Sequence, residues 1–369
     1  MIYIASVLSD IKECHVDDAV SIYALLIEEP EAHLHPQLQV NLYNFLKNAD
    51  DSENSQTFIT THSPTLTSKI PLENLILLKD NAAYHVGDCF VNRHTENIVR
   101  DVSNHNRKLT EDEVKSYRKM ITRYFDVTRS QLLFSNGCLF IEGISECQLM
   151  ETFSKLTSKS LIDNQIEIVD TDGTAFYQFL MLFNSSNDKV RLPMRAAFIT
   201  DEDQFTSSKD KEYNLDALCA NDYAQLAVLR NSINAGSMNG RVNNMNAMAN
   251  GRAEIKICSG VKTLEYQICK ANVFAGQEAT KGTWLYELIR SENADGIRKV
   301  EAYINGLGEH DLNDEEQQNV ALLLWKCLPG KAEFAQMLNT FLRDKIDAGA
   351  DVKFTVPSYI QTAINHLVP

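Results

Sequence analysis

The chain has 369 residues, of which 44% are hydrophobic and 23% are charged, as in ordinary globular proteins, and its length allows two or three domains. Its formal net charge is −15, which argues against a broad basic coat for non-specific nucleic-acid binding. It does not exclude a nucleic-acid enzyme, because bound divalent cations reverse the sign of charge locally.

The sequence has neither a membrane-spanning pattern nor a disulfide pattern. No apolar stretch approaches the ~18–20 residues that cross a bilayer, and no signal peptide begins the chain. The eight cysteines are scattered without a C-x-x-C pair, so we interpret them as buried thiols in a reducing cytosol. We expect a cytoplasmic protein without a membrane partner.

The first part of the chain, residues 1–95, predicts an α/β layer. It begins in an apolar segment that resembles the middle of a helix, and its strands alternate with one amphipathic helix. The expected segments are a helix at 1–8, strands at 23–27 and 56–60, a helix over 34–46, and two strands at 75–78 and 83–86 around a turn.

Residues 96–135 form a polar linker followed by a helix, which starts at a capping-box pattern at Thr110 and runs to Tyr124. Residues 136–260 then alternate strands with helices, which predicts parallel βαβ units in a Rossmann-like sheet. The expected segments are strands at 138–141, 166–169, 196–200 and 255–258, and helices at 145–156 and 175–183.

Two later segments are less regular. Residues 231–251 are rich in Asn, Gly and Met, and the pattern fits a loop and a weak helix equally well. Residues 261–369 are mostly helical, with a strand-like segment at 354–357 before a last helix at 359–367. The fold class is therefore α/β with a helical C-terminal region.

An acidic pair ends the strand at 23–27. Glu28 and Glu29 stand at its tip, and His62 follows the next strand in the same way. Nucleotide-hydrolysing motors use such groups to hold Mg²⁺, orient water and sense the γ-phosphate. They also need a Gly-rich P-loop with lysine, and this sequence contains no G-x-x-x-x-G-K-[ST].

A second set of carboxylates follows two strands of the later sheet. Glu142 and Glu146 form an E-G-x-x-E pattern, in which Gly143 allows a tight turn, and Asp201 and Asp203 form D-x-D. The carboxyl ends of parallel strands share one edge, so these side chains can converge there. Converging carboxylates bind Mg²⁺ or Mn²⁺, and two such ions can cleave a phosphodiester. Helix caps or solvated acids would explain a lone D-x-D, but the paired motifs favour a site.

Together these motifs resemble a known family. E-G-x-x-E with D-x-D looks like the Toprim fold of topoisomerases, primases and nucleases, and I-E-E-P-E-A-H-L-H-P with T-T-H-S-P resembles an ABC-type ATPase. That order is similar to the OLD (overcoming lysogenization defect) family, which joins an N-terminal ATPase to a Toprim nuclease. The resemblance covers the whole chain and implies a partial ATPase domain at 1–95 and a Toprim core at 136–260, completed by 261–369.

The resemblance also implies roles for single residues. Glu142, Glu146, Asp201 and Asp203 match the Toprim metal-binding acids, and one glutamate can also relay a proton. Glu265, in Thr-Leu-Glu, resembles a further metal ligand. Lys331 resembles a lysine that stabilises the transition-state phosphate, although a solvated lysine at a helix start explains it equally well. Asp170 and Asp172 precede Gly173 and are better explained by a turn.

In the ATPase half, the resemblance makes Glu28 the Walker B acid, Glu29 the water-polarising residue and His62 the switch histidine. His33 and His35 match a D-loop rather than a metal-ligand pair. The family's P-loop and signature motif are missing, so the chain resembles an OLD protein that lacks the N-terminal part of its ATPase domain. This fits a truncated gene, a wrong start or one part of a split protein.

We therefore expect a DNA endonuclease or nickase that uses two Mg²⁺ or Mn²⁺ ions. In the complete family form it is regulated by ATP and serves anti-phage or anti-plasmid defence. We expect a homodimer or higher oligomer, or a partner protein that supplies the missing ATPase half. The alternative is a non-catalytic remnant or an assembly subunit of a split system.

Overall fold

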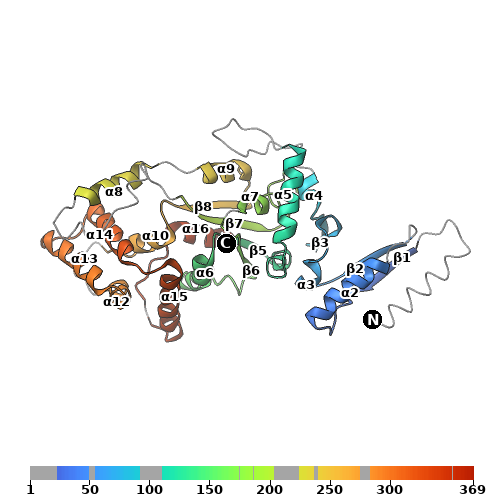
Figure 1. Cartoon of the computed structure of the whole chain (residues 1–369), viewed down its shortest axis with the longest axis horizontal. Helices are drawn as coiled ribbons and strands as arrows, with labels where there is room; N and C mark the ends of the chain where they lie inside the picture. Colours follow the sequence, from blue (N-terminus) through green and yellow to red (C-terminus); the bar gives the residue numbers. More distant parts are fainter. Residues whose placement is uncertain are drawn as a thin grey trace, which may run out of the picture.

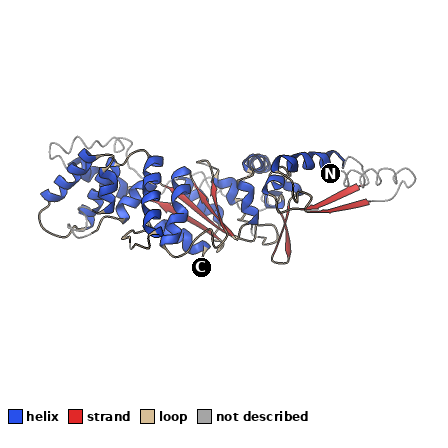
Figure 2. Ribbon diagram, turned by 90° about the horizontal axis from the view of Figure 1, so that it is seen from below, coloured by secondary structure: helices blue, strands red, loops and turns tan. Residues whose placement is uncertain are grey.

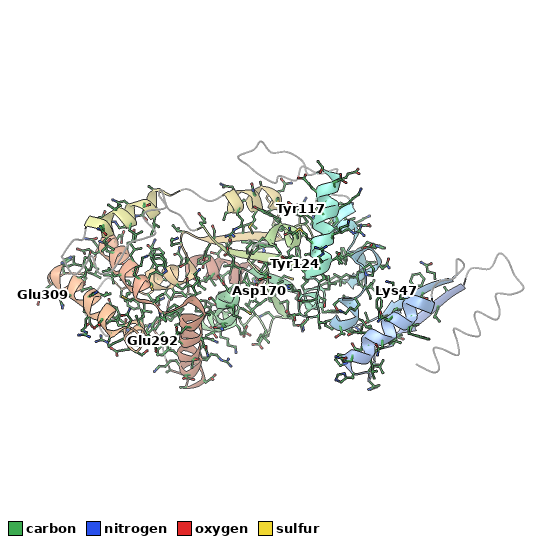
Figure 3. All side chains as sticks on the ribbon, viewed as in Figure 1. Lys47, Tyr117, Tyr124, Asp170, Glu292 and Glu309 are labelled. Carbon is green, nitrogen blue, oxygen red and sulfur yellow. The ribbon has the colours of Figure 1, made fainter. Side chains whose placement is uncertain are left out.

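The computed structural model describes residues 23–49, 55–91, 110–173, 175–185, 187–202, 224–236, 240–274, 283–350 and 352–369. The helix expected at 1–8 and most of the polar linker lie outside these residues. The described elements are strung along one long axis (Figure 1), with the parallel sheet in the middle and a smaller pair of strands at one end. Lys47 on the small end and Glu309 on the far helical end mark this extension (Figure 3).

The N-terminal part contains a parallel pair of strands and an antiparallel hairpin. In the parallel pair, Leu26 lies opposite Phe58, and Glu28 lies opposite Thr60. Both predicted strands are confirmed, as is the amphipathic helix between them. The elements are β1 (Tyr23–Glu28), α2 (Pro36–Ala49), β2 (Ser55–Thr60), α3 (Pro64–Thr67), a 3-10 turn η1 (Leu72–Asn74), β3 (Ile76–Lys79), β4 (Ala82–His85) and α4 (Asp88–Val91).

A helix and a 3-10 segment connect this part to the main sheet. Helix α5 (Glu111–Tyr124) begins at the predicted capping box, in which Thr110 and Glu113 exchange hydrogen bonds. The 3-10 segment η3 (Arg129–Phe134) follows. Arg129 links α5 to the sheet, because its guanidinium lies 5.4 Å from the Tyr124 ring and its Nε donates to the carbonyl of Asp170 over 2.8 Å. Figure 3 labels Tyr124 and Asp170.

The main sheet has four parallel strands in the order β6-β5-β7-β8. Its central strand β5 is buried along its whole length, as the unbroken apolar run predicts for a parallel strand covered on both faces. The strands are β5 (Gly137–Ile141), β6 (Ile166–Asp170), β7 (Arg195–Asp201) and β8 (Ile255–Gly260). The predicted α/β class is confirmed.

Alternate residues of the sheet face two separate hydrophobic clusters. Leu139 and Ile141 pack with residues of helices α6, α10, α15 and α16, whereas Cys138 and Phe140 pack with residues of α5, α7 and α9. Figure 2 shows the strands enclosed between helices. These helices are α6 (Ile144–Leu156), α7 (Phe176–Leu180), α9 (Gly240–Ala249), α10 (Leu264–Ala271), α15 (Lys331–Asp347) and α16 (Ser358–Leu367).

The segment at 231–251, for which the sequence left two readings, contains the end of α8 (Ala224–Ala235) and all of α9. Val242, Met245, Met248 and Ala249 recur at helical spacing and are buried, so α9 is held by its apolar stripe. The helical region that follows is confirmed and also contains α12 (Trp284–Arg290), α13 (Ala294–Gly306) and α14 (Asp314–Cys327). None of the described helices has the length and apolarity that a bilayer crossing needs.

The prediction of a strand-like segment at 354–357 is wrong, because no strand forms there. The backbone of Thr355 pairs with a side chain instead. Its N–H donates to Oδ1 of Asn272 over 2.9 Å, and its carbonyl accepts from Nδ2 of the same residue over 3.1 Å. The apolar pattern is explained by Phe354, whose ring stacks on Phe153 at a centroid distance of 5.2 Å.

Candidate active site

The predicted carboxylates lie where the strand order of the main sheet reverses. From β5 the chain passes to β6 on one side, and from there to β7 on the other side of β5. Glu142 directly follows β5, and Asp201 is the last residue of the neighbouring β7. In open α/β sheets, the crevice outside the carboxyl ends at such a reversal is the usual ligand site.

The side chain of Glu142 is held by three donors on one oxygen. Its Oε1 accepts hydrogen bonds from the backbone N–H of Asp201 over 3.0 Å, from the hydroxyl of Thr200, and from Nη2 of Arg241 over 2.6 Å. Among the described residues, Oε2 accepts no hydrogen bond. One oxygen therefore fixes the carboxylate, and the other remains available to a ligand.

Glu146 and Glu265 approach the same edge from the first turns of two helices, α6 and α10. Carboxylates are stabilised at this position by the helix dipole. Asp201 is tied to α10 as well, because its Oδ2 accepts from the backbone N–H of Leu264 over 3.3 Å. Glu146, Asp201 and Glu265 are 8%, 7% and 5% exposed, so the site is a nearly buried acidic cluster.

The burial and mutual repulsion of these acids raise the pKa of two of them. Burial raises the pKa of Glu146 to about 7, and the negative charges of Glu142 and Glu265 add to the effect. Burial also raises the pKa of Asp201 well above its ordinary value, again with the neighbouring carboxylates contributing. Lys331 opposes both shifts, which places its positive charge within electrostatic reach of the cluster.

Lys331 is the first residue of α15, and the N-cap Gly330 makes no side-chain cap. A cation at this end opposes the helix dipole, which typically costs about 0.3–1 kcal/mol at an exposed site. Helix α15 packs against α6, whose first turn carries Glu146. The position is thus unfavourable for the helix alone and favourable for the acidic cluster beside it.

The chemistry of the cluster fits a hard divalent cation. Buried Oε2 of Glu265 and the buried hydroxyl of Tyr359 both lack a hydrogen-bond partner among the described residues. An orphaned carboxylate oxygen in an acidic cluster is what a Mg²⁺ ligand offers. As the described side chains stand, no three acids, His or Cys are close enough together to hold an ion. Asp203 lies outside the described residues.

Two local readings of the sequence have different outcomes. Gly143 has φ −177° and ψ −162°, an extended backbone open to any residue, and a Cβ there would meet nothing within 4 Å. The chain does bend at Glu142 and Gly143 between β5 and α6, but this bend does not need a glycine. The turn inferred for Asp170 and Asp172 is present, since Asp172 has φ 52° and its N–H donates to Oδ1 of Asp170 over 2.8 Å.

Sequence reasoning missed two polar residues that reach this edge, Arg241 and Tyr359. Arg241 comes from α9, whose Asn-rich sequence gives no motif, and Tyr359 comes from the last helix, α16. Burial raises the pKa of Tyr359 well above its ordinary value, and the negative charges of Asp201 and Glu146 raise it further. The phenol therefore stays protonated. No spacing rule connects either residue to the acidic motifs.

The proposed nucleotide residues lie together at the end of β1 and β2. Glu28 ends β1, and Glu29 follows it with φ 42°. Nε2 of His62 lies 3.3 Å from Oε1 of Glu29, and both side chains are at least half exposed. Sequence reasoning missed Glu31, whose Oε1 accepts from the hydroxyl of Thr61 and from the N–H of His62 over 3.2 Å.

Comparison with family models gives two separate matches. Residues 7–67 match an AAA ATPase domain. Residues 133–203 match the TOPRIM domain of overcoming lysogenization defect protein-like sequences. The fold is thus an ATPase-like segment followed by a TOPRIM domain, in the order expected from the motifs.

Among curated proteins, the chain is similar to three nucleases. It is 26% identical to the OLD nuclease of Thermus scotoductus over 43% of this chain and 28% of the relative. It is 30% identical to endonuclease GajA of Bacillus cereus, over 48% of this chain and 26% of that relative. It is 26% identical to the Old nuclease of Escherichia phage P2, over 70% of this chain and 42% of that relative. Each match spans less than half of the relative.

Among solved structures, the C-terminal region of the Burkholderia pseudomallei OLD protein is 19% identical, with a TM-score of 0.35 over 63% of this chain and 97% of that chain. The C-terminal region of the Xanthomonas campestris OLD protein is 16% identical, with a TM-score of 0.33 over 64% of this chain and 94% of that chain.

Proposed function

The chain belongs to the OLD family, and from that premise we propose that it is a metal-dependent DNA endonuclease or nickase. The observation that supports the proposal is that four carboxylates and Lys331 lie within electrostatic reach of one another at one edge of the sheet. We propose the division into a partial ATPase domain (1–95), a linker (96–135), a nuclease core (136–260) and a helical region (261–369) that completes it.

Two bound Mg²⁺ or Mn²⁺ ions would activate a water and stabilise the leaving oxygen of a phosphodiester. Glu142 would offer Oε2, Glu265 would offer its unpaired Oε2, and Asp201 and Asp203 would complete the ligand set. Glu146 would be a ligand or accept a proton on its carboxylate, for which a pKa of about 7 is suited. The ammonium of Lys331 would face the phosphate that gains charge.

We propose that Glu28, Glu29 and His62 belong to an ATP site that another chain or segment completes, and that ATP regulates cleavage. The face of the β1–β2 pair supports this, because Leu26 is 77% exposed and its register partner Phe58 is 47% exposed. A homodimer or a partner protein would cover it. In this proposal the protein acts on DNA in the cytoplasm, in defence against phage or plasmids.

A plasmid-nicking assay tests the nuclease proposal. The purified chain should convert supercoiled plasmid to open circles or linear DNA with Mg²⁺ or Mn²⁺ and not with EDTA. Asp201→Asn should abolish cleavage. Asp295→Asn is a matched control, because Asp295 lies on α13 and, within the described part of the chain, pairs only with its neighbour Arg298. Cleavage that survives Asp201→Asn would overturn the proposed site, and no cleavage by any of the proteins would favour the non-catalytic alternative.

A further inference from the structure

Arg241 brings a positive charge into the acidic site from the opposite side to Lys331. It lies on α9, which packs in the hydrophobic cluster on one face of the sheet, whereas α15 packs in the cluster on the other face. Figure 1 shows these two helices on either side of the strands. The carboxyl edge of the sheet therefore has a basic residue on each flank.

Among the described residues, the hydrogen bonds of Arg241 use one of its three side-chain nitrogens. Nη2 donates to Oε1 of Glu142 over 2.6 Å and to the backbone carbonyl of Asp201 over 2.9 Å. The guanidinium carbon lies 5.9 Å from the centre of the Phe176 ring. These contacts fix the orientation of the guanidinium at the point where Glu142 and Asp201 meet.

The remaining donors of Arg241 are unused within the described part of the chain. Nε is buried and has no hydrogen-bond partner, and Nη1 makes no hydrogen bond there. Leaving a buried donor unsatisfied typically costs about 1–3 kcal/mol, and more on a charged group. A charged donor left in this condition beside a proposed active site indicates a ligand with acceptor oxygens.

The acidic cluster limits what that ligand can be. Glu142, Glu146, Asp201 and Glu265 repel an anion, so an anionic substrate needs positive charge close to them. A phosphodiester oxygen accepts a charge-assisted hydrogen bond from a guanidinium N–H. We propose that Arg241 binds a phosphate of the DNA strand at the cleavage site through Nη1, the unused donor that the protein does not bury. The inference rests on the proposed nuclease function and adds a substrate contact to it.

A simpler account is that Arg241 only balances the charge of Glu142. The two accounts differ in what salt does to DNA binding. Each phosphate neutralised by a protein cation contributes about −0.9 to the slope of log affinity against log salt concentration. A charge balancer inside the protein contributes nothing to this slope, but its removal changes the affinity of the acidic cluster for cations.

The test measures binding of a short fluorescent DNA duplex in Ca²⁺ across a series of KCl concentrations. Arg241→Ala should weaken binding about tenfold or more and make the slope shallower by about 0.9, the effect of losing one phosphate contact. Arg241→Lys should retain the slope and lower the cleavage rate, because lysine keeps the charge and loses the fixed orientation of the planar guanidinium. Arg298→Ala removes an equal charge from α13, where Arg298 pairs with Asp295 alone among the described residues, and should bind like the wild type.

The outcomes separate this inference from the function on which it rests. If the wild type binds and cleaves DNA while Arg241→Ala keeps the wild-type slope and affinity, the phosphate contact is overturned and the nuclease stands. If that variant changes only the affinity for Mn²⁺, measured by calorimetry without DNA, Arg241 is a charge balancer. A wild type that neither binds nor cleaves DNA overturns both. Circular dichroism of each variant checks its fold, and the conservative Arg241→Lys keeps the comparison open if Arg241→Ala unfolds.

Discussion

The hydroxyl of Thr200 on β7 donates a hydrogen bond to the carboxylate of Glu142, the residue that follows the neighbouring strand β5. The register explains this contact, because Phe140 lies opposite Phe198, and two further residues along each strand bring Glu142 opposite Thr200. The stacked rings of Phe140 and Phe198, 4.6 Å apart, fix that register inside the core. One side of the site is therefore held by the packing of the sheet itself.

Glu146 should make the stability of the metal-free protein depend on pH. Its pKa is about 7 in the folded protein, against an ordinary value of 4.5. Between these two values the folded state holds a proton that the unfolded state has lost. The stabilisation that comes from this proton is lost as pH rises from about 4.5 through 7. The free energy of unfolding in EDTA should fall over this range, by on the order of 3 kcal/mol at most from this group.

The variant Glu146→Gln isolates this contribution, because the amide has a similar shape and does not titrate. Its free energy of unfolding, from urea titrations at several pH values, should fall less steeply than that of the wild type between pH 5 and 8. Some slope should remain from Asp201, whose pKa is also raised. Mg²⁺ should reduce the difference, because it favours the ionised carboxylate. Parallel curves for the two proteins in EDTA would contradict the prediction.

Lys331 should matter for cleavage and not for folding. Lys331→Met removes the charge and keeps most of the chain length, and we expect cleavage to fall on the order of 10²–10³-fold, as for other electrostatic contacts to a transition state. Affinity for Mn²⁺ should be equal or higher, since a positive charge leaves the cluster. The urea needed for unfolding should change little, because a lysine at the start of α15 opposes the helix dipole but favours the acidic cluster beside it.

A matched control lies on the same helix. Lys345 is in the last turn of α15, where a cation is favourable to the dipole, and its ammonium lies 5.6 Å from the ring of Phe341. Lys345→Met should cleave like the wild type and be slightly less stable. Equal cleavage by Lys331→Met and Lys345→Met would show that Lys331 is only a solvated residue at a helix start.

The sequence predicted the parts of the site that lie in strands and their turns. The buried run before Glu142 and the run before Asp201 identified two strands, and parallel pairing then required their carboxyl ends to meet. Arg241 and Tyr359 could not be predicted in this way, because each reaches the site through the packing of a helix distant in sequence. At Thr355 the sequence pattern predicted too much. Its apolar neighbours suggested a strand, but its backbone pairs with the side chain of Asn272.

Tyr359→Phe should stabilise the metal-free protein. The hydroxyl of Tyr359 is buried without a partner among the described residues, and its ring lies against the end of β8, 3.2 Å from where a Cβ on Gly260 would lie. Removing an unsatisfied buried hydroxyl should raise the free energy of unfolding by about 1 kcal/mol or more in urea titrations with EDTA. With saturating Mg²⁺ the gain should shrink, because the hydrated ion gives the hydroxyl a partner.

Two other tyrosines serve as comparisons. Tyr286 also has a buried hydroxyl without a partner in the described chain, so Tyr286→Phe should stabilise equally with and without Mg²⁺ if its hydroxyl is remote from the ion. The hydroxyl of Tyr303 accepts from Asn319 over 2.9 Å, so Tyr303→Phe should destabilise. A loss of stability in metal-free Tyr359→Phe, like that of Tyr303→Phe, would mean that its hydroxyl is already satisfied.

The chain alone should hydrolyse ATP negligibly, although Glu29 and His62 lie 3.3 Å apart as a water-orienting pair would. Its sequence has no P-loop, so nothing in it supplies the backbone amides and lysine that cradle the phosphates. Phosphate release by the purified chain with Mg²⁺ should be at background, and Glu29→Gln should not change it. The stability of this variant should also be close to wild type, because an exposed ion pair contributes at most about 1 kcal/mol. Metal-dependent ATP turnover that Glu29→Gln abolishes would show that the chain completes its own nucleotide site.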